Sequence, residues 1–330
     1  MVHLNLMPEV EGEGQMWKFM GIYAKNREEW AFTDLATLRQ GGTVIAFYDT
    51  LGPAAVEFVI RQTGLTTVAC ISKSLRTLIM LKSQGRADSI QNLISFDKIE
   101  DDVHSDAEQA GIKLYHIRDV IEAGRANKES ITFTEPTADT TALFCYTSGT
   151  TGDPKAAKIS HENLVAVVTG AQYGGFNIDH NDVMISYLPL AHSFEQLLFV
   201  ASIAYGSKIG YYSGDVLKLT DDCQVLKPTL FPSVPRIYTR IYDKIQARLA
   251  DLTATRSYIA NKAIQSKLYY LANYATYNYG FYDRIVCNKF KAILGGNIRI
   301  MATGSAPIAV DVLNFLKVSF CCPILEGYGQ

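Results

Sequence analysis

The stretch TALFCYTSGTTGDPKAAK, residues 141 to 158, joins a short apolar run to a loop of hydroxyl side chains and glycines that closes on Lys155. The run TALFCY predicts a buried strand, and SGTTGDPKAAK reads as the loop that follows it. Two glycines would let the backbone turn its N–H groups inward, and the hydroxyls and the lysine add donors. The spacing is not that of a Walker loop, because Asp153 and Pro154 precede Lys155. Composition alone therefore leaves a phosphate cradle and a solvated turn equally favoured.

On both sides of this loop, short β-branched or aromatic runs alternate with longer segments of helical period. This alternation predicts βα units and parallel sheets.

Ser160 is a typical N-cap for a helix that begins at His161. We expect one lobe over residues 1–125, a polar connection over 126–140 and a phosphate-loop lobe over 141–330. The expected strands are 43–47, 66–71, 92–96, 141–146, 183–187, 207–212 and 298–302, and the expected helices are 28–39, 53–63, 161–172, 236–249, 256–275 and 307–319.

Composition limits the class of protein. The 330 residues are 48% hydrophobic and 19% charged, with a formal net charge of −2, which is typical of a globular chain and not of a disordered or fibrous one. This balance gives no reason to expect nucleic acid as a partner. The six cysteines have no metal-binding spacing and are expected to be reduced thiols, which favours the cytosolic side of the cell. We see no apolar run long enough to span a bilayer, which takes about 20 residues.

Longer motifs give a family resemblance. TSGTTGDPK followed by SHENL resembles the phosphate-loop signature of the adenylate-forming, or AMP-binding, enzyme superfamily. Further stretches resemble long-chain fatty acyl-CoA synthetases, in that family's order. They are AKNREEW (24–30), FYDTLGPAAVEFVI (47–60), YLPLAHSFEQ (187–196), VPRIYTRIYDKI (234–245), LGGNIRIMATGSAP (294–307) and ILEGYGQ (324–330). The resemblance implies an α/β fold, the N-terminal domain of an adenylate-forming enzyme, with two lobes of mostly parallel sheet flanked by helices.

The resemblance also implies a reaction. A long-chain fatty acid attacks the α-phosphate of ATP to give acyl-AMP and pyrophosphate, and the thiol of coenzyme A then displaces AMP. The expected partners are therefore the fatty acid, ATP and CoA. Two alternatives stay open: a non-catalytic remnant that binds acyl chains or nucleotide, and a ligase for another carboxylic acid, such as an aryl or short-chain one.

Site residues follow from the matching motifs. The resemblance places Lys155 and His192 in catalytic roles, with His192 positioning the carboxylate and stabilising charge, and with Phe194 lining the acyl pocket. Without that context a core or loop histidine would be the favoured interpretation of His192. Residues that would contact the β- and γ-phosphates are Thr147, Ser148, Gly149, Thr150, Thr151, Gly152 and Lys155. Residues that would form the adenine slot, which could otherwise be plain β-to-α turns, are Gly304, Ser305, Ala306, Gly327, Tyr328 and Gly329.

The ends of the chain depart from the family pattern. The resemblance implies a Thr-Glu pair just beyond Gln330, whose glutamate helps hold Mg²⁺, and later a C-terminal domain with a catalytic lysine. We therefore expect residues 1–330 to be a partial AMP-binding domain, truncated before the C-terminal domain, with little or no activity. Ala156 stands where the family usually has glycine.

The segment 256–291 is rich in tyrosine and basic residues. Such a stripe is most often a helix packed on its own domain with a solvated basic side. The alternative is peripheral contact with an anionic membrane, where each basic residue contributes about 1 kcal/mol. By resemblance, that membrane would belong to the endoplasmic reticulum or the peroxisome.

Overall fold

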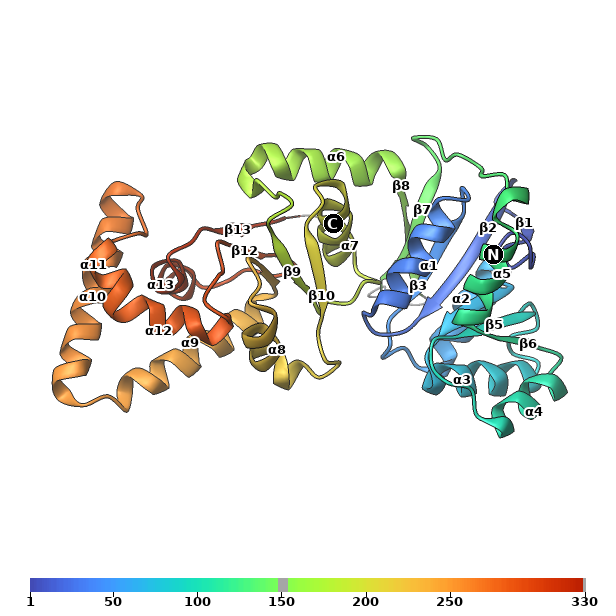
Figure 1. The fold of residues 1–330 in the computed structure, drawn as a ribbon, viewed down its shortest axis with the longest axis horizontal. Coiled ribbons are helices and arrows are strands. Elements are labelled where there is room, and N and C mark those ends of the chain that lie inside the picture. The colour runs from blue at the N-terminus through green and yellow to red at the C-terminus, as the bar shows by residue number, and fades with distance from the viewer. Residues whose placement is uncertain (148–153, 329–330) are drawn as a thin grey trace. The chain divides into compact units, whose positions relative to one another are not determined.

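The chain folds into two compact α/β units (Figure 1). The structure is a computed structural model that describes residues 1–147 and 154–328. Unit 1 consists of Met1–Thr169 and Pro189–Gln196, and unit 2 of Gly170–Leu188 and Leu197–Gln330. Each unit contains its own sheet flanked by helices, which confirms the predicted fold class.

Unit 1 is built on an eight-stranded sheet in the order β6-β5-β4-β2-β3-β7-β8, with β1 paired to β2. The neighbours are parallel except at β1–β2 and β7–β8, which are antiparallel. Strands β3, β4 and β5 are buried along their whole length, as expected for parallel strands covered on both faces. The strands are β1 (Glu9–Gly12), β2 (Gln15–Tyr23), β3 (Thr43–Phe47), β4 (Thr67–Cys70), β5 (Asn92–Ser95), β6 (Lys113–His116), β7 (Thr141–Thr147) and β8 (Lys155–Ser160).

The helices of unit 1 begin and end at recognisable signals. Helix α2 has proline in its first turn and ends at Gly64, whose φ of +62° is the left-handed conformation that glycine adopts without strain. The Oγ of Ser160 accepts a hydrogen bond from the Asn163 N–H at 3.1 Å, which confirms the predicted N-cap. The helices are α1 (Glu28–Leu38), α2 (Pro53–Thr63), α3 (Ser72–Ser83), α4 (Asp101–Gln109), α5 (Ile117–Ala126), the short η1 (Lys128–Ser130) and α6 (His161–Ala171), whose last two residues belong to unit 2.

Unit 2 is built on a parallel five-stranded sheet in the order β10-β9-β11-β12-β13. Tyr238 is fully buried and ties α9 to this sheet, because its hydroxyl donates to the carbonyl oxygens of Phe231 at 2.7 Å and Ala302 at 3.1 Å. The strands are β9 (Val183–Ser186), β10 (Lys208–Tyr211), β11 (Leu230–Ser233), β12 (Ile300–Thr303) and β13 (Ile324–Glu326).

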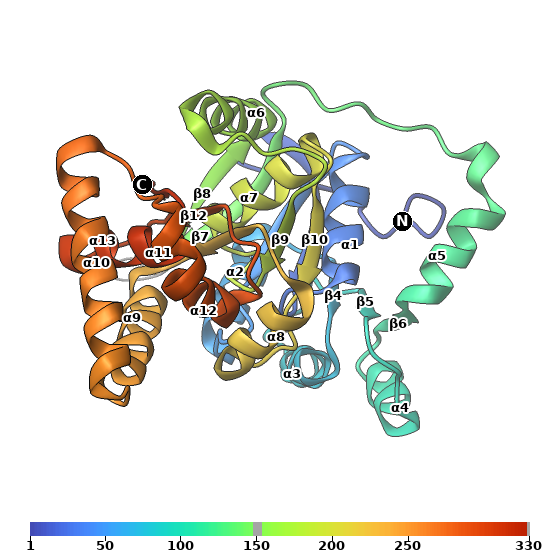
Figure 2. The same cartoon turned by 60° about the vertical axis from the view of Figure 1, so that its left-hand side comes forward.

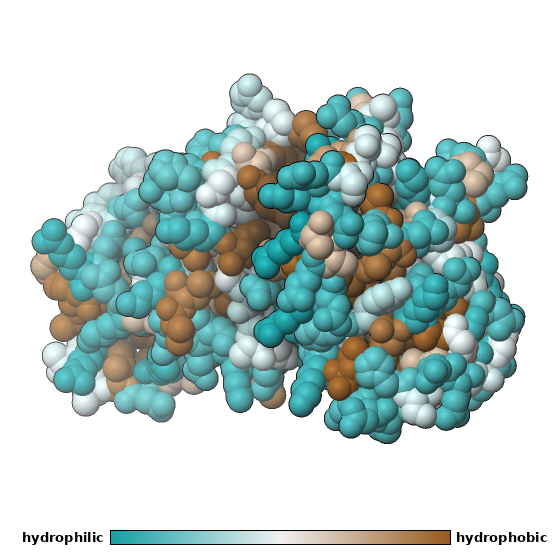
Figure 3. All heavy atoms as spheres, turned by 45° about the vertical axis from the view of Figure 1, so that its right-hand side comes forward, coloured by the Kyte–Doolittle hydropathy of each residue, from teal (hydrophilic) through white to brown (hydrophobic). Residues whose placement is uncertain are grey.

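Helices α9, α10, α12 and α13 pack against one another within unit 2, as Figures 1 and 2 both show. Two π-helical turns, η2 and η4, interrupt the regular helices. The helical segments are η2 (Gln172–Phe176), α7 (Ser193–Ala204), whose first four residues belong to unit 1, η3 (Val216–Lys218), α8 (Leu219–Leu226), α9 (Pro235–Ala250), α10 (Ala254–Tyr274), α11 (Gly280–Tyr282), η4 (Asp283–Cys287), α12 (Asn288–Lys291), η5 (Ala292–Leu294) and α13 (Val310–Phe320). On the face drawn in Figure 3, hydrophilic side chains are interspersed with apolar patches, which is ordinary for a globular surface.

Two expectations from the sequence differ from the structure. Residues 155–158, predicted as the end of the loop, belong to β8, which pairs with β7 in the register Thr147↔Lys155. Their alanines and lysines carry little strand signal, and backbone pairing with β7 supplies the order instead. Because β7 and β8 extend the sheet of unit 1, the units do not divide at residue 141, and the expected connection 126–140 lies inside unit 1.

Asp34 of α1 makes the stability of the protein depend on pH. Its side chain is buried, its Oδ2 has no hydrogen-bond partner among the described residues, and burial raises its pKa to about 7. The folded state therefore holds a proton that the unfolded chain releases near pH 4, so this group's contribution to stability falls as pH rises toward 7. We expect Asp34→Asn to raise the unfolding midpoint at pH 8 clearly more than at pH 5.5.

The size of this effect follows from about 1.4 kcal/mol per pKa unit, which gives a few kcal/mol at most. Thermal unfolding at both pH values measures it, and the exposed Asp88→Asn serves as the matched control. Equal shifts for Asp34→Asn at pH 5.5 and pH 8 would contradict the assignment of a protonated carboxyl.

Candidate functional site

The segment around His192 presents a hydrogen-bond donor in unit 1. The Phe194 backbone N–H donates to His192 Nδ1 at 3.1 Å, so the neutral ring carries its proton on Nε2. Burial lowers the pKa of His192, which keeps the ring neutral at pH 7. The half-buried imidazole therefore offers an Nε2–H donor, as a positioning and charge-stabilising role requires.

Three contacts hold this segment in place. The Leu190 N–H donates to Asn26 Oδ1 at 3.0 Å, and Asn26 Nδ2 donates to the fully buried Glu195 carboxylate at 3.4 Å. The Cys145 thiol of β7 donates to the Ala191 carbonyl at 3.3 Å. Asn26 lies in the AKNREEW motif, to which sequence reasoning assigned no role. The structure shows that its amide ties that motif to the His192 segment.

The two ends of the loop predicted to bind phosphate lie on the β7–β8 pair. Thr147 is the last residue of β7 and Lys155 the first of β8, and the Thr147 hydroxyl donates to the Lys155 carbonyl at 3.4 Å. Both residues are exposed. The pairing brings the two ends of the loop together. Thr147 lies two residues after Cys145, whose thiol contacts the Ala191 carbonyl. The predicted phosphate contacts Ser148, Gly149, Thr150, Thr151 and Gly152 lie outside the described residues.

The residues predicted for the adenine slot come together in unit 2. Gly304 follows β12 and Gly327 follows its parallel neighbour β13, and the Gly327 N–H donates to the Thr303 carbonyl at 2.8 Å. Ser305 adopts a left-handed φ of +68°, which turns the chain sharply after β12, and Ser305 and Ala306 are both exposed. Tyr328 is 92% exposed, so its ring is free to stack on a planar ligand. Gly329 lies outside the described residues.

Polar side chains that sequence reasoning missed lie at the same edge. Ser233 ends β11 opposite Thr303, and its hydroxyl accepts a hydrogen bond from Tyr187, which follows β9, at 2.6 Å. The buried Thr303 hydroxyl has no hydrogen-bond partner among the described residues. Ligands of open α/β sheets bind at the carboxyl ends of the strands. This edge of the unit 2 sheet therefore has the polar lining that a nucleotide site needs.

Comparison with known proteins assigns the family. A family model described as AMP-binding enzyme matches residues 16–330. The chain belongs to the AMP-binding enzyme family. Among curated relatives, mouse long-chain-fatty-acid–CoA ligase 5 is 36% identical over 318 residues, which are 95% of this chain and 46% of the relative. Peroxisomal long chain acyl-CoA synthetase 7 of Arabidopsis thaliana is 36% identical over 311 residues, which are 94% of this chain and 44% of the relative. The chain thus spans less than half the length of these relatives.

Solved structures of AMP-binding enzymes share the fold. The adenylation domain of a carboxylate reductase from Mycobacterium chelonae aligns with a TM-score of 0.76 at 21% identity, over 95% of this chain and 47% of that one. The didomain of a carboxylic acid reductase from Segniliparus rugosus, in complex with AMP, aligns with a TM-score of 0.73 at 20% identity. The alignment covers 95% of this chain and 42% of that one. At these identities the likeness shows the fold alone.

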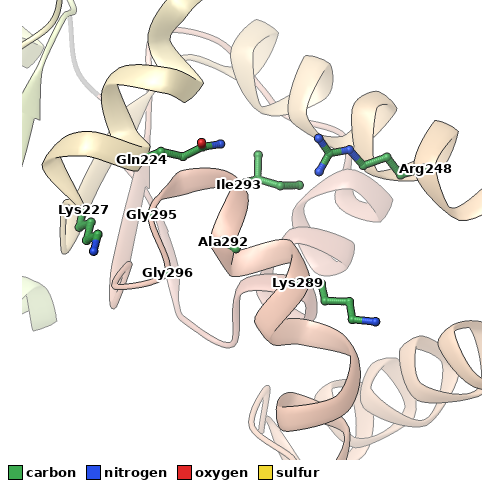
Figure 4. A pocket seen from close by; sticks show the side chains of 8 residues that line it. All are labelled: Gln224, Lys227, Arg248, Lys289, Ala292, Ile293, Gly295 and Gly296. Carbon is green, nitrogen blue, oxygen red and sulfur yellow. The ribbon is translucent and has the colours of Figure 1, made fainter.

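A basic pocket of about 390 Å³ lies elsewhere in unit 2 (Figure 4). Lys227 precedes β11 and Gly296 precedes β12, so the pocket lies at the amino ends of these strands, opposite the edge that carries Gly304 and Gly327. Among the described residues, none that was predicted for the AMP-binding site lines it. The lining residues are Gln224, Lys227, Arg248, Lys289, Ala292, Ile293, Gly295 and Gly296.

Among the described residues, no helix is both long enough and apolar enough to cross a membrane.

Proposed function

We propose that residues 1–330 carry the nucleotide- and acyl-binding functions of a long-chain fatty acid–CoA ligase, which converts a fatty acid and ATP to acyl-AMP and then to acyl-CoA. The observation that carries the proposal is the His192 donor, which Cys145 and Asn26 hold beside the strands that bear the phosphate loop. The names of the relatives at 36% identity support the long-chain fatty acid as substrate.

The proposed roles follow from charge. A fatty acid is an aliphatic carboxylic acid with a pKa of about 4 to 5, so it is ionised at pH 7 and its oxygen attacks the α-phosphorus without a general base. The bond from this phosphorus to the bridging oxygen breaks, and pyrophosphate leaves. The Nε2–H of His192 and the Lys155 ammonium donate to oxygens that become more negative along this path. The edge with Gly304, Gly327 and Tyr328 binds adenine, and CoA takes the acyl group in the second step.

Magnesium neutralises the phosphates of ATP when it is bound, but the described ends of the loop do not fit it. Thr147 and Lys155 provide a hydroxyl and an ammonium, whereas Mg²⁺ prefers carboxylate and water oxygens. These two side chains suit phosphate oxygens instead, and we assign no Mg²⁺ ligand among them.

Palmitate-dependent exchange of pyrophosphate into ATP tests the proposed function. It is measured with palmitate, with benzoate and without acid, on residues 1–330 and on their fusion to the C-terminal part of the mouse relative. Exchange by the fusion with palmitate supports the proposal. Exchange with benzoate alone indicates a ligase for another acid, and absence of exchange from a folded fusion indicates a non-catalytic protein; either contradicts the proposal.

His192→Ala is expected to lower the exchange rate of the fusion about 100-fold, the usual effect of losing one donor to developing charge. His192→Gln, which retains an N–H donor, is expected to recover part of the rate. The exposed His104→Ala is the control. An unchanged rate for His192→Ala, with the fold intact by circular dichroism, would contradict the role given to this ring.

We further propose that unit 2 contacts an anionic membrane through a tyrosine patch, defined as Tyr269, Tyr274, Tyr279 and Phe281. Tyr269 is 58%, Tyr274 64% and Phe281 65% exposed, and rings from Tyr269 to Tyr282 form a chain of contacts. Exposed aromatic rings with basic neighbours suit a lipid interface. The basic neighbours in the sequence are Arg256, Lys262, Arg284, Lys289 and Lys291.

Sedimentation with vesicles tests this contact. We expect binding to vesicles that contain phosphatidylserine and little binding to phosphatidylcholine alone. The double variant Tyr269→Ser and Phe281→Ser should lose most of the bound fraction, whereas Tyr173→Ser, at a 90% exposed tyrosine outside the patch, should keep it. Equal binding by the two variants would rule the patch out.

A further inference from the structure

A lysine, an aspartate and two cysteines gather inside unit 2, outside the site described above. Lys267 of α10 is 1% exposed. Its ammonium donates to Asp283 in the π-helical turn η4, to Cys321 Sγ at 3.0 Å and to Cys287 Sγ at 3.4 Å. Cys287 ends η4, and Cys321 follows the last residue of α13. Residues separated by up to 54 positions therefore meet around one buried charge.

The hydrogen bonds in this cluster are complete in the reduced state. The three N–H groups of Lys267 have three acceptors: the Asp283 carboxylate and the two sulfurs. The Cys321 thiol donates to Asp283 Oδ1 at 3.3 Å, and the Cys287 thiol donates to the Val318 carbonyl at 3.4 Å. Burial lowers the pKa of Lys267, but hydrogen bonds to Asp283 and Cys321 outweigh it and raise this pKa above its usual value. The lysine is therefore a permanent cation beside two sulfurs.

A metal ion is the first alternative for such a cluster. The Asp283, Cys287 and Cys321 ligand atoms lie within 4.8 Å of one another, as they would around a cation. The Lys267 ammonium already donates to all three, and a buried ammonium at this point both fills the position and repels a second cation. The arrangement fits activation of a thiol better than binding of a metal.

The two thiols affect each other's ionisation, and the lysine affects both. The Cys321 thiol proton serves Asp283 in the reduced state and the Cys287 sulfur once that sulfur ionises; this hydrogen bond and the charge of Lys267 lower the pKa of Cys287, against the opposing effect of burial. The same hydrogen bond and burial raise the pKa of Cys321. Both sulfurs lie within hydrogen-bond distance of the Lys267 ammonium, which favours a thiolate at Cys287, and Cys321 is half-buried, which opens the cluster to a small oxidant.

We propose that Cys287 and Cys321 are a peroxide-sensitive dithiol, which Lys267 activates and which oxidation converts to a disulfide between η4 and the end of α13. The Cys287 thiolate attacks one oxygen of hydrogen peroxide, the O–O bond breaks, and hydroxide leaves with a proton as water, giving a sulfenic acid. The Cys321 thiol attacks the sulfenic sulfur, the S–O bond breaks, and a second water leaves. The two thiols together lose two protons and two electrons, which the peroxide gains to form the two waters. This site is independent of the proposed ligase function.

Peptide mapping after graded peroxide treatment tests the proposal. The folded chain is treated at pH 7, free thiols are blocked with iodoacetamide, and cross-linked peptides are identified by mass spectrometry. We expect the Cys287–Cys321 disulfide to form first, with loss of two hydrogens and reversal by dithiothreitol. Cys223 provides an internal control, because it is a buried thiol of the same unit whose pKa burial raises to about 12. It should stay reduced.

Two variants separate activation from mere proximity. Lys267→Met is expected to slow disulfide formation about 10-fold at pH 7 and to approach the wild-type rate at pH 9, where the thiol ionises unaided. Cys321→Ser removes the resolving thiol and leaves Lys267 in place, so Cys287 should accumulate as a sulfenic acid that dimedone traps, even if Lys267→Met fails to fold. Oxidation of Cys287 no faster than Cys223, a Cys321–Cys322 disulfide, or protection of both thiols by stoichiometric zinc would overturn the proposal.

Discussion

Gly295→Ala is expected to lower the free energy of unfolding by about 3 to 5 kcal/mol, and Gly296→Ala by only about 1 to 2 kcal/mol. The two glycines have almost the same left-handed φ, +87° and +86°. Their surroundings differ. A Cβ at Gly295 would lie 2.4 Å from the Cys223 carbonyl oxygen and 2.8 Å from the Lys227 Cα, whereas a Cβ at Gly296 meets nothing within 4 Å. Both variants bear the conformational strain, but only Gly295→Ala must also displace the backbone at the end of α8.

Urea unfolding of the two variants measures this difference. Because their conformational strain is the same, the difference between them isolates the close approach of the chain to α8. Equal midpoints for the two variants would show that the end of α8 moves aside at no cost, and would contradict the packing described here.

Arg299→Ala is expected to lower the free energy of unfolding by about 3 to 5 kcal/mol, because it leaves a buried carboxylate without its cation. Asp182 is 2% exposed and accepts hydrogen bonds from Arg299 Nε at 2.7 Å and from the Thr229 hydroxyl at 2.6 Å. Burial raises the pKa of Asp182, but these bonds outweigh it and hold the pKa below its usual value. The ion pair joins β12 to the start of β9, so its loss destabilises the sheet of unit 2.

The pH dependence gives a second readout. With a lowered folded-state pKa, Asp182 stabilises the protein above pH 4 and loses this contribution as pH falls further. The cost of Arg299→Ala should therefore shrink in acid. Arg76→Ala, which breaks an exposed pair with Glu100 and Asp102, is the control and should leave the midpoint unchanged. A cost for Arg299→Ala as small as that of the control would contradict the buried pair.

Local patterns predicted much of the fold. Helix α2 was expected over its observed residues, Pro53–Thr63, because proline and glycine mark its two ends. Strands β3 and β9 were predicted correctly because β-branched residues stand between turn signals there. Strand β8 was missed, since its order comes from pairing with β7 and not from its own residues. The unit boundary was misplaced for the same reason, because no local sequence signal shows which sheet a strand joins.

The site was predictable only as separate motifs. The family resemblance singled out His192, but nothing local connects it to Asn26, whose partner Glu195 is 169 positions away. Gly295 and Arg299 lie in a motif quoted for its resemblance, and the structure gives both a physical reason: a close backbone approach and a buried ion pair. The sequence shows how many cysteines there are, but not that Cys287 and Cys321 accept hydrogen bonds from the same lysine, Lys267.

Binding of a stable acyl-adenylate mimic tests the central claim most directly, because it needs no turnover. Palmitoyl-sulfamoyl-adenosine and its benzoyl counterpart are titrated into residues 1–330 by calorimetry, alongside His192→Ala and Tyr328→Ala. We expect tighter binding of the palmitoyl compound than of the benzoyl compound, and at least about a 10-fold loss of affinity, near 1.4 kcal/mol, in each variant. Undetectable binding of the palmitoyl compound, or equal affinity for both mimics and all three proteins, would contradict a long-chain acyl-adenylate site in this chain.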